Sequence, residues 1–385
     1  MIINLNKTVK KILIIRGRYT DPAIRKVAKS LHQEGYDITL LIWDRSGKRS
    51  LSEEKNEYKI EYFSLRAPQD KLSAVFFLPI WWAYELFYIF KMKPDIIHAC
   101  DLETQYPAII AKIVRKKHFV YMIYDFYANN LPNGKFPRIR NAIRSIVANI
   151  EKIGIGFADL LILVDESRYE EVKGAKIKKI IYIYNAPEEV IEQKDQNLSE
   201  ISDNSIVIFY AGIINKTRGI SDMITAVEDM NDVVLILAGP VVDESIFKDR
   251  INEKIKYIGW IPTYNEIIAK TKKADILFRF SDHNHPKTKY ESPNKLFEAM
   301  MYGKPIIVSD HSSMAKIVRQ EKCGIVVKYG DIKGIKDAIN ILKNNKDVCN
   351  QLGENGRRSY DNKYSWEIMK NRLVNAYDLL SKESC

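Results

Sequence analysis

Cysteine is scarce in this sequence, and its spacing does not suggest metal binding. The chain of 385 residues has four cysteines without a CxxC or other metal-type spacing, Cys100, Cys323, Cys349 and Cys385. We therefore expect reduced thiols in a cytoplasmic protein rather than the disulfide framework of a small secreted one. The N-terminal residues MIINLNKTVKK lack an apolar run of useful length, so a signal peptide is not expected.

Acidic residues are outnumbered, and the imbalance is concentrated in the first half of the chain. The net charge is +11 at pH 7, and residues 1–190 contribute 31 Lys and Arg against 22 Asp and Glu, a net charge of +9. Such a half would suit nucleic acid, an anionic membrane face or a phosphorylated acceptor, although scattered solvated lysines would look the same. Because no DNA- or RNA-binding motif of known spacing is present, nucleic acid is not expected as a partner.

Two successive α/β domains with parallel sheets are predicted, because short apolar, β-branched runs alternate with helical patterns. The length agrees, since a single core rarely grows beyond about 250–300 residues. A polar stretch at 189–204 indicates a linker between domains at 1–188 and 205–363, and a last amphipathic helix falls within 364–385. The predicted strands are 11–15, 37–43, 58–63, 95–98, 119–124, 160–164, 180–184, 205–210, 233–238, 256–258, 276–280, 305–309 and 324–327.

One long apolar segment, AVFFLPIWWAYELFYIF at residues 74–90, leaves two interpretations open. It is slightly short for a membrane span, and it contains Pro79 and Glu85. Either its aromatic side chains enter the lipid interface, or the helix is buried against the first sheet. In the first case residues 74–93 form a peripheral membrane contact through Trp81, Trp82, Phe87 and Tyr88, with Lys71, Lys91 and Lys93 near anionic headgroups.

The most informative stretch is ESPNKLFEAMMYGKP at residues 291–305. A polar turn with Pro293 leads into an amphipathic helix that the sequence GKP ends. Backbone N–H groups at a helix start bind anions, and Lys295 adds a positive charge there. Glu298, further along, can accept hydrogen bonds from sugar hydroxyls. A diphosphate at the helix start and a ribose on the carboxylate describe a nucleotide-sugar site, and an ordinary capped helix is the alternative.

This stretch resembles the retaining nucleotide-sugar glycosyltransferases of the GT-B fold, in particular glycosyltransferase family 4. EAMMYGKP, which begins at Glu298, fits that family's run E-A-M-x-x-G-x-P. Tyr290 stands where the first of two family glutamates is usual, as in members that carry the variant PNKLFE. The resemblance implies donor contacts from Pro293, Asn294 and Glu298. It also implies two Rossmann-like, doubly wound domains facing a central cleft, with the terminal helix packed back on the first domain.

A basic loop in the second half, YAGIINKTRGI, extends the resemblance to the donor's diphosphate. Gly212 and Arg218 match the family pattern, and an arginine can hold phosphate oxygens bidentately. Ile213 replaces an arginine that is common in the family, so Lys216 or Lys295 would have to supply that charge.

The loop IGWIP resembles the segment whose backbone reads the nucleobase in this family. Gly259 would permit the close approach of the base, and Trp260 would pack at the rim of its site. Taken alone, the same residues would fit a plain turn equally well.

In the first domain the resemblance covers two loops that follow predicted strands. Gly17 lies in a small-residue loop that the family brings towards the sugar and phosphate, and we assign Arg18 and Arg25 to the acceptor side. The run DIIHACD matches the family's D-x-x-H-x-H-D. It places His98 on the acceptor side as well, although a structural histidine at a strand end is the commoner case.

The sequence YDFY falls where relatives show Y-D-x-H. Tyr127 stands in the place of a histidine that contacts the donor sugar and assists catalysis, and Asp125 keeps a carboxylate beside it. A phenol can donate a hydrogen bond but does not titrate near neutral pH.

The resemblance implies transfer of a sugar, with retention at the anomeric carbon, from a UDP- or GDP-sugar donor. The acceptor would be a hydroxyl of a glycan or polyprenyl-phosphate-linked molecule in cell-surface polysaccharide or glycoconjugate synthesis. We assign catalysis to Arg218, Lys295, Asp125 and Tyr127. Asp-x-Asp, the usual metal clamp of the other glycosyltransferase fold, is absent, so neither a metal nor another cofactor is expected.

The expected location is the cytoplasm, with peripheral contact at the inner face of the cell membrane if residues 74–93 are interfacial. Two other functions remain open. One is a GT-B epimerase of the UDP-N-acetylglucosamine 2-epimerase kind, which needs acid–base groups in the site. The other is a catalytically silent nucleotide-binding protein, which the replacements at Ile213, Tyr290 and Tyr127 would suit.

Overall fold

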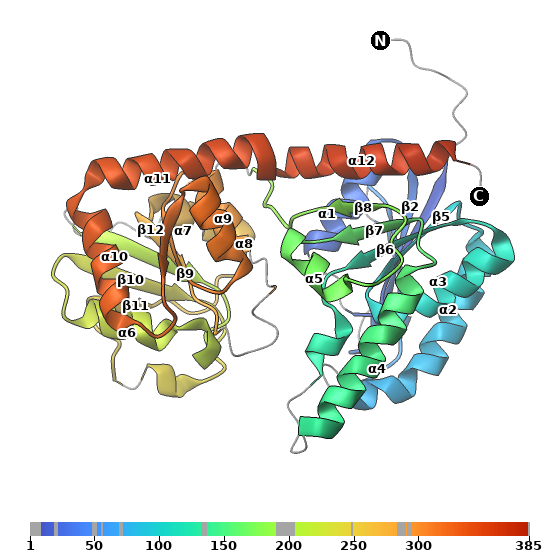
Figure 1. The fold of residues 1–385 in the computed structure, drawn as a ribbon, viewed down its shortest axis with the longest axis horizontal. Coiled ribbons are helices and arrows are strands. Elements are labelled where there is room, and N and C mark those ends of the chain that lie inside the picture. The colour runs from blue at the N-terminus through green and yellow to red at the C-terminus, as the bar shows by residue number, and fades with distance from the viewer. Residues whose placement is uncertain are drawn as a thin grey trace, which may run out of the picture. The chain divides into compact units, whose positions relative to one another are not determined.

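Two α/β units make up the chain, each built on one sheet flanked by helices (Figure 1). The first unit comprises Met1–Ile183 and Met369–Cys385, and the second comprises Tyr184–Ile368. The prediction of two doubly wound α/β domains is confirmed. This structure is a computed structural model that describes residues 9–18, 22–47, 52–54, 57–68, 72–131, 137–189, 205–247, 249–282, 290 and 294–383.

The first sheet has the strand order β3-β4-β2-β1-β5-β6-β7-β8. All neighbouring strands are parallel apart from β3, which pairs antiparallel with β4. Apolar, β-branched runs such as KILIIR in β1 are buried on both faces, as a covered parallel sheet requires. The strands are β1 (Lys11–Arg16), β2 (Asp37–Asp44), β3 (Ser52–Glu54), β4 (Lys59–Ser64), β5 (Ile96–Cys100), β6 (His118–Ile123), β7 (Leu160–Leu163) and β8 (Ile180–Tyr182).

Helices of the first unit pack against this sheet and against one another. On one side α2 packs on α3, and α3 packs on α4 (Figure 1). The helices are α1 (Pro22–Gln33), α2 (Leu78–Met92), α3 (Leu102–Arg115), α4 (Pro137–Ile155) and α5 (Tyr169–Val172), with 3₁₀ turns at Leu72–Phe77, Tyr127–Asn130 and Glu166–Arg168.

The last helix, α12 (Trp366–Lys382), packs on the first unit from Met369 onward. Tyr377 is fully buried there, and its hydroxyl lies 2.6 Å from His98 Nδ1 of β5. Tyr36 donates a hydrogen bond of 2.7 Å to Asp378 on the same helix. These contacts join the C-terminal residues to the core of the first unit.

The second unit begins at Tyr184, five residues before the predicted linker. The Tyr184 ring packs edge-on against Phe297 at 5.5 Å, and the carbonyl of Pro187 accepts a hydrogen bond from Tyr360. The apolar and carbonyl groups of this segment therefore have their partners in the second unit. Most of the predicted linker, residues 190–204, lies outside the described residues.

The second sheet is wholly parallel, with the order β11-β10-β9-β12-β13-β14. Its strands are β9 (Ile206–Ala211), β10 (Val233–Ala238), β11 (Ile255–Tyr257), β12 (Ile276–Arg279), β13 (Ile306–Ser309) and β14 (Gly324–Val327). Its helices are α6 (Ile220–Glu228), α7 (Tyr264–Lys273), α8 (Asn294–Met301), α9 (Ser313–Glu321), α10 (Ile332–Asn344) and α11 (Lys346–Ser359), with short turns at Lys216–Arg218 and Glu244–Ile246 and a π-helical turn at Tyr360–Tyr364.

The long apolar segment forms a 3₁₀ turn and helix α2, and it combines features of both interpretations. Its inner side is buried in the first core, where Trp81 stacks on Trp43 at 5.6 Å. Its outer side is exposed, with Phe76 79% and Phe87 60% accessible. Within the part of the chain that the structure describes, Ser73–Met92 is the one helical stretch that is long and apolar enough to cross a membrane, and 28% of it is buried.

Candidate active site

In both sheets the strand order reverses beside the first strand of the unit. β1 lies between β2 and β5, and β9 lies between β10 and β12. Doubly wound proteins bind ligands outside the carboxyl ends of the strands at such a reversal. Gly17 directly follows β1, and Gly212 directly follows β9, so two predicted site residues start the loops at these points.

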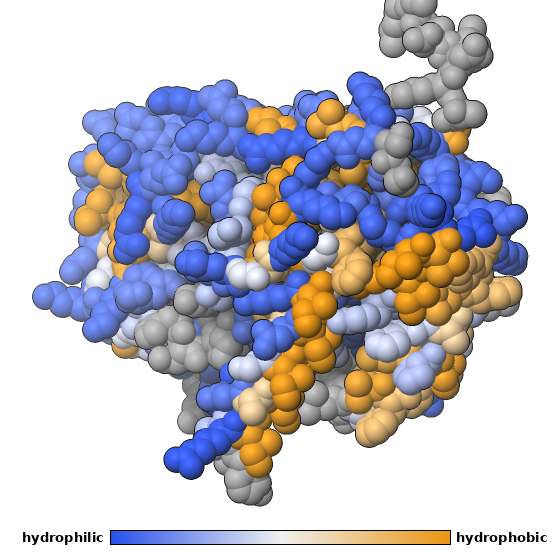
Figure 2. Space-filling view, turned by 45° about the vertical axis from the view of Figure 1, so that its right-hand side comes forward, coloured by the Kyte–Doolittle hydropathy of each residue, from blue (hydrophilic) through white to orange (hydrophobic). Residues whose placement is uncertain are grey.

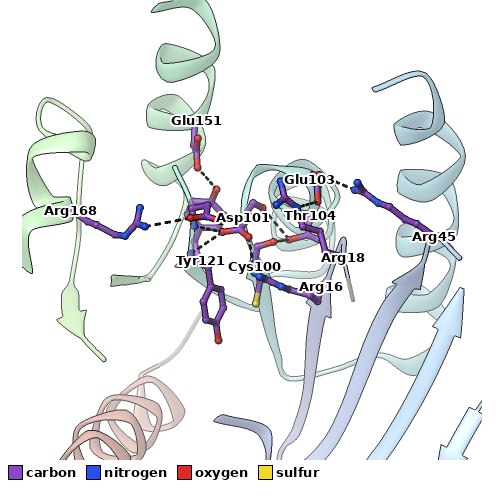
Figure 3. A network of polar contacts seen from close by, with 12 residues as sticks. Arg16, Arg18, Arg45, Cys100, Asp101, Glu103, Thr104, Tyr121, Glu151 and Arg168 are labelled. Atoms are coloured by element: carbon purple, nitrogen blue, oxygen red, sulfur yellow. Dashed lines mark hydrogen bonds and ion pairs between the residues drawn. The ribbon is translucent and has the colours of Figure 1, made fainter. Parts of the chain in front are cut away.

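Asp101 ties three strand ends of the first unit together (Figure 3). Its carboxylate lies 2.6 Å from Arg16 Nη1 at the end of β1, and it accepts the N–H groups of Tyr124 and Asp125 after β6, at 2.8 and 3.1 Å. Burial raises the pKa of Asp101, while the charge of Arg16 and the hydrogen bond from the Asp125 N–H act in the opposite direction. Its φ of 62° costs a non-glycine residue about 1–3 kcal/mol, which these bonds offset.

Glu103, in the first turn of α3, gathers two arginines at the same edge. Its carboxylate lies 2.8 Å from Arg45 Nη2 and 3.6 Å from Arg18 Nε, and Figure 3 shows both guanidinium groups directed at it. Glycine is required at Gly17, because a Cβ there would lie 2.6 Å from Glu103 Oε2. The predicted residues Gly17 and Arg18 therefore belong to one charged group at the end of β1.

Asp125 and Tyr127 lie in the loop after β6, beside this group. The half-exposed Asp125 carboxylate is 3.4 Å from Arg168 Nη2, which approaches from the turn after β7. The Tyr127 N–H donates to Glu151 Oε2 at 3.0 Å. Burial and the charge of Glu103 raise the pKa of the Tyr127 phenol, so at neutral pH it is protonated and can donate a hydrogen bond.

Glu151 supports that loop from the inner face of α4. Besides the Tyr127 N–H, its carboxyl group accepts the Tyr121 hydroxyl at 2.8 Å. Burial raises the pKa of Glu151 to about 8, although both hydrogen bonds act in the opposite direction. The group is therefore largely neutral at pH 7 and sits under the loop without adding a full charge.

Two predicted acceptor-side residues occupy other surroundings. His98 lies inside β5, fully buried, and burial lowers its pKa to about 3. Because His98 Nδ1 is hydrogen-bonded to the Tyr377 hydroxyl, we assign His98 a structural role, which is the commoner role for a histidine at a strand end. Arg25 is half-buried on α1, where its charge acts on the Tyr58 phenol.

Glycine loops form the carboxyl edge of the second sheet. A Cβ at Gly239, where φ is 125°, would lie 2.1 Å from the carbonyl oxygen of Gly212. The Gly212 N–H bonds to the Ala238 carbonyl at 2.9 Å, and the Gly239 N–H bonds to that of Gly259 at 2.8 Å. The predicted residues Gly212 and Gly259 therefore lie in one hydrogen-bonded set of loops. Trp260 beside them is 67% exposed.

The turn that carries Arg218 contacts the end of β12. Thr217 accepts the N–H of Asp282 at 3.1 Å through its carbonyl. Gly219, with φ 58°, leads into α6 and leaves room for Phe280, which a Cβ would approach to 2.8 Å. Lys216 in the same turn is 72% exposed and pairs with Asp243. Arg218 thus stands at the reversal between β9 and β12.

Helix α8 begins after β12 at Asn294, and Pro293 lies outside the described residues. Lys295 Nζ donates to Glu298 Oε2, and the Tyr264 hydroxyl of α7 donates to Glu298 Oε1 at 3.1 Å. Glu298 is 1% exposed, and burial raises the pKa of Tyr264. Two predicted residues, Lys295 and Glu298, are therefore in direct contact. The Glu298 carboxylate accepts one hydrogen bond from the charged Lys295 ammonium group and one from the neutral Tyr264 hydroxyl.

Several members of these groups were not predicted. Asp101 directly follows β5 and Arg45 directly follows β2, so their places after buried strands were the available signal. Glu103, Glu151 and Arg168 lie on helices or turns and had no distinguishing pattern. Among the described residues no three His, Cys, Asp or Glu gather as a metal site would need, and the expectation of a metal-free protein stays a prediction.

The chain is similar both to a family of known proteins and to single relatives. Residues 191–359 match the family model "Glycosyl transferases group 1". The capsular polysaccharide biosynthesis glycosyltransferase CapM of Staphylococcus aureus is 26% identical over 197 residues, which cover 49% of this chain and 50% of CapM. The chain thus spans about half the length of such curated relatives.

Two solved structures resemble nearly the whole chain. The sucrose-phosphate synthase of Thermosynechococcus elongatus has a TM-score of 0.77 at 17% identity, covering 97% of this chain and 99% of that one. HepE of Anabaena, in complex with UDP-glucose, has a TM-score of 0.67 at 14% identity, covering 96% of this chain and 100% of that one. At these identities the likeness shows the shared two-domain fold.

Proposed function

We propose that this chain, which has the GT-B fold and matches the family model "Glycosyl transferases group 1" over residues 191–359, is a glycosyltransferase that transfers a sugar from a nucleotide diphosphate sugar to a hydroxyl group. The donor is UDP- or GDP-linked. The acceptor is a glycan or a lipid-linked molecule of cell-surface polysaccharide or glycoconjugate synthesis. The CapM likeness supports this acceptor class, and the UDP-glucose bound to HepE supports the donor class.

The observation that carries the proposal is the contact of Lys295, Glu298 and Tyr264 at the start of α8. A buried carboxylate with two fixed donors is oriented to accept ribose hydroxyls. The diphosphate then lies at the α8 start and Arg218, where backbone N–H groups and two cationic side chains meet its charge. No metal is needed in this scheme, because Lys295 and Arg218 supply the positive charge.

The sugar is transferred with retention. The bond between the anomeric carbon and the diphosphate oxygen breaks, and the acceptor oxygen bonds to that carbon on the same face. The acceptor's proton passes to the departing phosphate oxygen, so no carboxylate pair of the glycosidase kind is required. Arg218 and Lys295 stabilise the leaving charge. Tyr127, with its protonated phenol, and Asp125, with its carboxylate, stay the candidate residues of the first unit.

A calorimetric titration with UDP and with GDP tests the donor site first. We expect one of the two to bind, and we expect Glu298→Gln to weaken it about tenfold, because a hydrogen bond to a charged group contributes about 1.5–3 kcal/mol. Lys256→Gln, at a half-buried lysine of β11, is the control and keeps wild-type affinity. Failure of both nucleotides to bind would remove the proposal.

Product analysis with the bound nucleotide's sugar tests the reaction. We expect a glycoside with the donor's anomeric configuration, and Arg218→Ala should lower kcat by about a hundred- to a thousandfold, as loss of an oxyanion donor does. Lys216→Ala, at the exposed neighbour, should change it little. Conversion of the donor to its epimer would indicate an epimerase. Nucleotide binding without turnover would indicate a silent binding protein, for which the exposed Ile213 in place of an arginine would be the reason.

A further inference from the structure

Helix α4 has its apolar residues on the outside. Its exposed large apolar residues recur at alternating steps of four and three, which places them in one line along the helix. Figure 2 shows orange surface running diagonally down the lower part of the view. The line consists of Ile139, Ile143, Ile146, Ile150, Ile153 and, just beyond the helix, Phe157, with exposures between 38% and 63%.

The inner face of α4 is adapted to close packing instead. Gly154 lies close to α3 there, since a Cβ would be 2.3 Å from the end of the Gln105 side chain. Glu151 and Ile155 are fully buried on the same face. At its C-terminal end, therefore, α4 packs on the unit through a different face from the isoleucine line.

Neighbouring helices extend the apolar surface. α3 packs on α4 and exposes Ile110, Ile113 and Val114, which are 46–62% accessible. α2 packs on α3, and it exposes Ile80 and Phe87. Figure 2 shows a broad orange patch to the right of the diagonal one. Contiguous apolar surface of this kind on a soluble unit marks a site of interaction.

Exposed charge on these three helices is entirely positive. Each helix has one carboxylate, and all three are buried, namely Glu85, Glu103 and Glu151. The basic residues lie at the helix ends and beside the isoleucine line, Lys91 on α2, Lys112 and Arg115 on α3, and Arg138, Arg140, Arg144 and Lys152 on α4.

We propose that the α2–α3–α4 face of the first unit docks on an anionic lipid surface, with the isoleucine line in the interface and the basic residues at the headgroups. Apolar side chains flanked by cations match the two contributions that bind amphipathic helices to anionic membranes. Lys112 is paired with Asp159, and a second copy of the chain would bring the other six like charges on each side together without exposed carboxylates on these helices, which disfavours self-association. A membrane span is disfavoured because α2 holds Trp81 and Glu85 inside the unit.

Vesicle flotation tests the proposal without any nucleotide, so its outcome does not depend on the proposed reaction. Wild-type protein is mixed with phosphatidylcholine vesicles with and without phosphatidylglycerol. We expect it to float with the anionic vesicles, to dissociate at high salt, and to bind the neutral vesicles weakly. Ile146→Asn with Ile153→Asn should lower partitioning about a hundredfold, since each loses about one buried isoleucine from the interface.

A matched control substitutes two apolar residues that are equally exposed but lie elsewhere. Ile341→Asn on α10 and Leu379→Asn on α12, which are 49% and 57% accessible, should leave flotation unchanged. All the substituted side chains are on the surface, so equal thermal unfolding midpoints establish that every variant is folded.

Three results would overturn the proposal. The wild type could fail to float with the anionic vesicles. The Ile146 and Ile153 variant could float as the wild type does. Binding would then be explained by the positive charge of the protein alone, without the isoleucine line. Finally, light scattering over a concentration series could show a wild-type dimer that this variant dissociates, and a second copy would then be the occupant of the face.

Discussion

The two units share one strand order around their first strand but close their carboxyl edges by different means. In the first unit, ion pairs join the strand ends, with Asp101 and Glu103 holding Arg16 and Arg45. In the second unit, the loops approach through backbone atoms, and Gly239 allows the contact. The carboxyl edge of the first sheet is therefore held by charged side chains, and that of the second sheet is held by backbone contacts that glycine makes possible.

This difference has a functional meaning under the proposed reaction. Glycine loops let a ligand approach the backbone closely, which suits a phosphate-bearing group that many donors share. Side-chain networks can be changed one residue at a time, which suits the part of the protein that selects an acceptor. The units should accordingly respond differently to substitution.

The largest expected effect on the first unit comes from Asp101→Ala. Removing one partner of a buried ion pair leaves Arg16 uncompensated and typically costs about 3–5 kcal/mol. Two backbone N–H groups after β6 lose their acceptor as well. We expect faster hydrogen exchange in peptides of residues 11–16 and 118–125, measured by mass spectrometry, and unchanged exchange in 206–247.

Asp101→Asn is the informative companion variant. It keeps an acceptor for the backbone N–H groups but not the charge, so its exchange should fall between wild type and Asp101→Ala. Equal acceleration in both units on Asp101→Ala would contradict the separation of the two units, because it would mean that they unfold together.

The corresponding substitution in the second unit is Gly239→Ala. The added Cβ would meet the Gly212 carbonyl oxygen at 2.1 Å in a backbone conformation that side chains rarely adopt, and we expect a loss of about 3 kcal/mol in the free energy of unfolding. Denaturant titration measures it, and nucleotide affinity should fall with it.

Gly330→Ala provides the control for backbone strain alone. Gly330 has φ 77°, and no atom lies within 4 Å of its Cβ position, so about 1–2 kcal/mol is expected. If both alanine variants lost the same free energy of unfolding, backbone strain alone would explain the loss, and the close contact between Gly239 and Gly212 would contribute nothing to it.

The sheets could be predicted from the sequence because buried parallel strands are continuous apolar runs. All thirteen predicted strands are present within one or two residues of their ends, and β3 (Ser52–Glu54) was missed because its three residues are polar. The second unit begins at Tyr184, whereas the sequence indicates a linker at 189–204 and a second domain from 205. The contacts of Tyr184 and Pro187 involve residues more than a hundred positions away, so no local pattern marks this start.

The candidate residues of the second unit follow from local sequence patterns more than those of the first unit do. Glycine spacing and the run at Glu298 are local patterns, so Gly212, Gly259 and Lys295 could be named from them. The ion pairs of the first unit join residues from separate strands, for example Arg45 with Glu103, and no local spacing marks such pairs. His98 shows the converse, because a familiar motif position turned out to be a buried partner of Tyr377.

The smallest expected effect concerns pH and the carboxyl group of Glu151. Burial raises its pKa from 4.5 to about 8, so the folded protein binds a proton that the unfolded chain has released, and stability falls as pH rises through this range. Between pH 7 and 8 the loss from this group is about 1 kcal/mol. His98, with its pKa lowered to about 3, acts in the opposite direction only at more acidic pH.

Denaturation midpoints at pH 7 and 8 measure this dependence, and Glu151→Gln, which resembles the neutral acid, should reduce it. It should not abolish it, because burial also raises the pKa of Glu85 and gives a slope of the same sign. Glu166→Gln, at an exposed glutamate, should keep the wild-type dependence. An unchanged slope in Glu151→Gln would mean that this carboxyl group is ionised under the Tyr127 loop, and that the first unit has one more negative charge than the burial of Glu151 indicates.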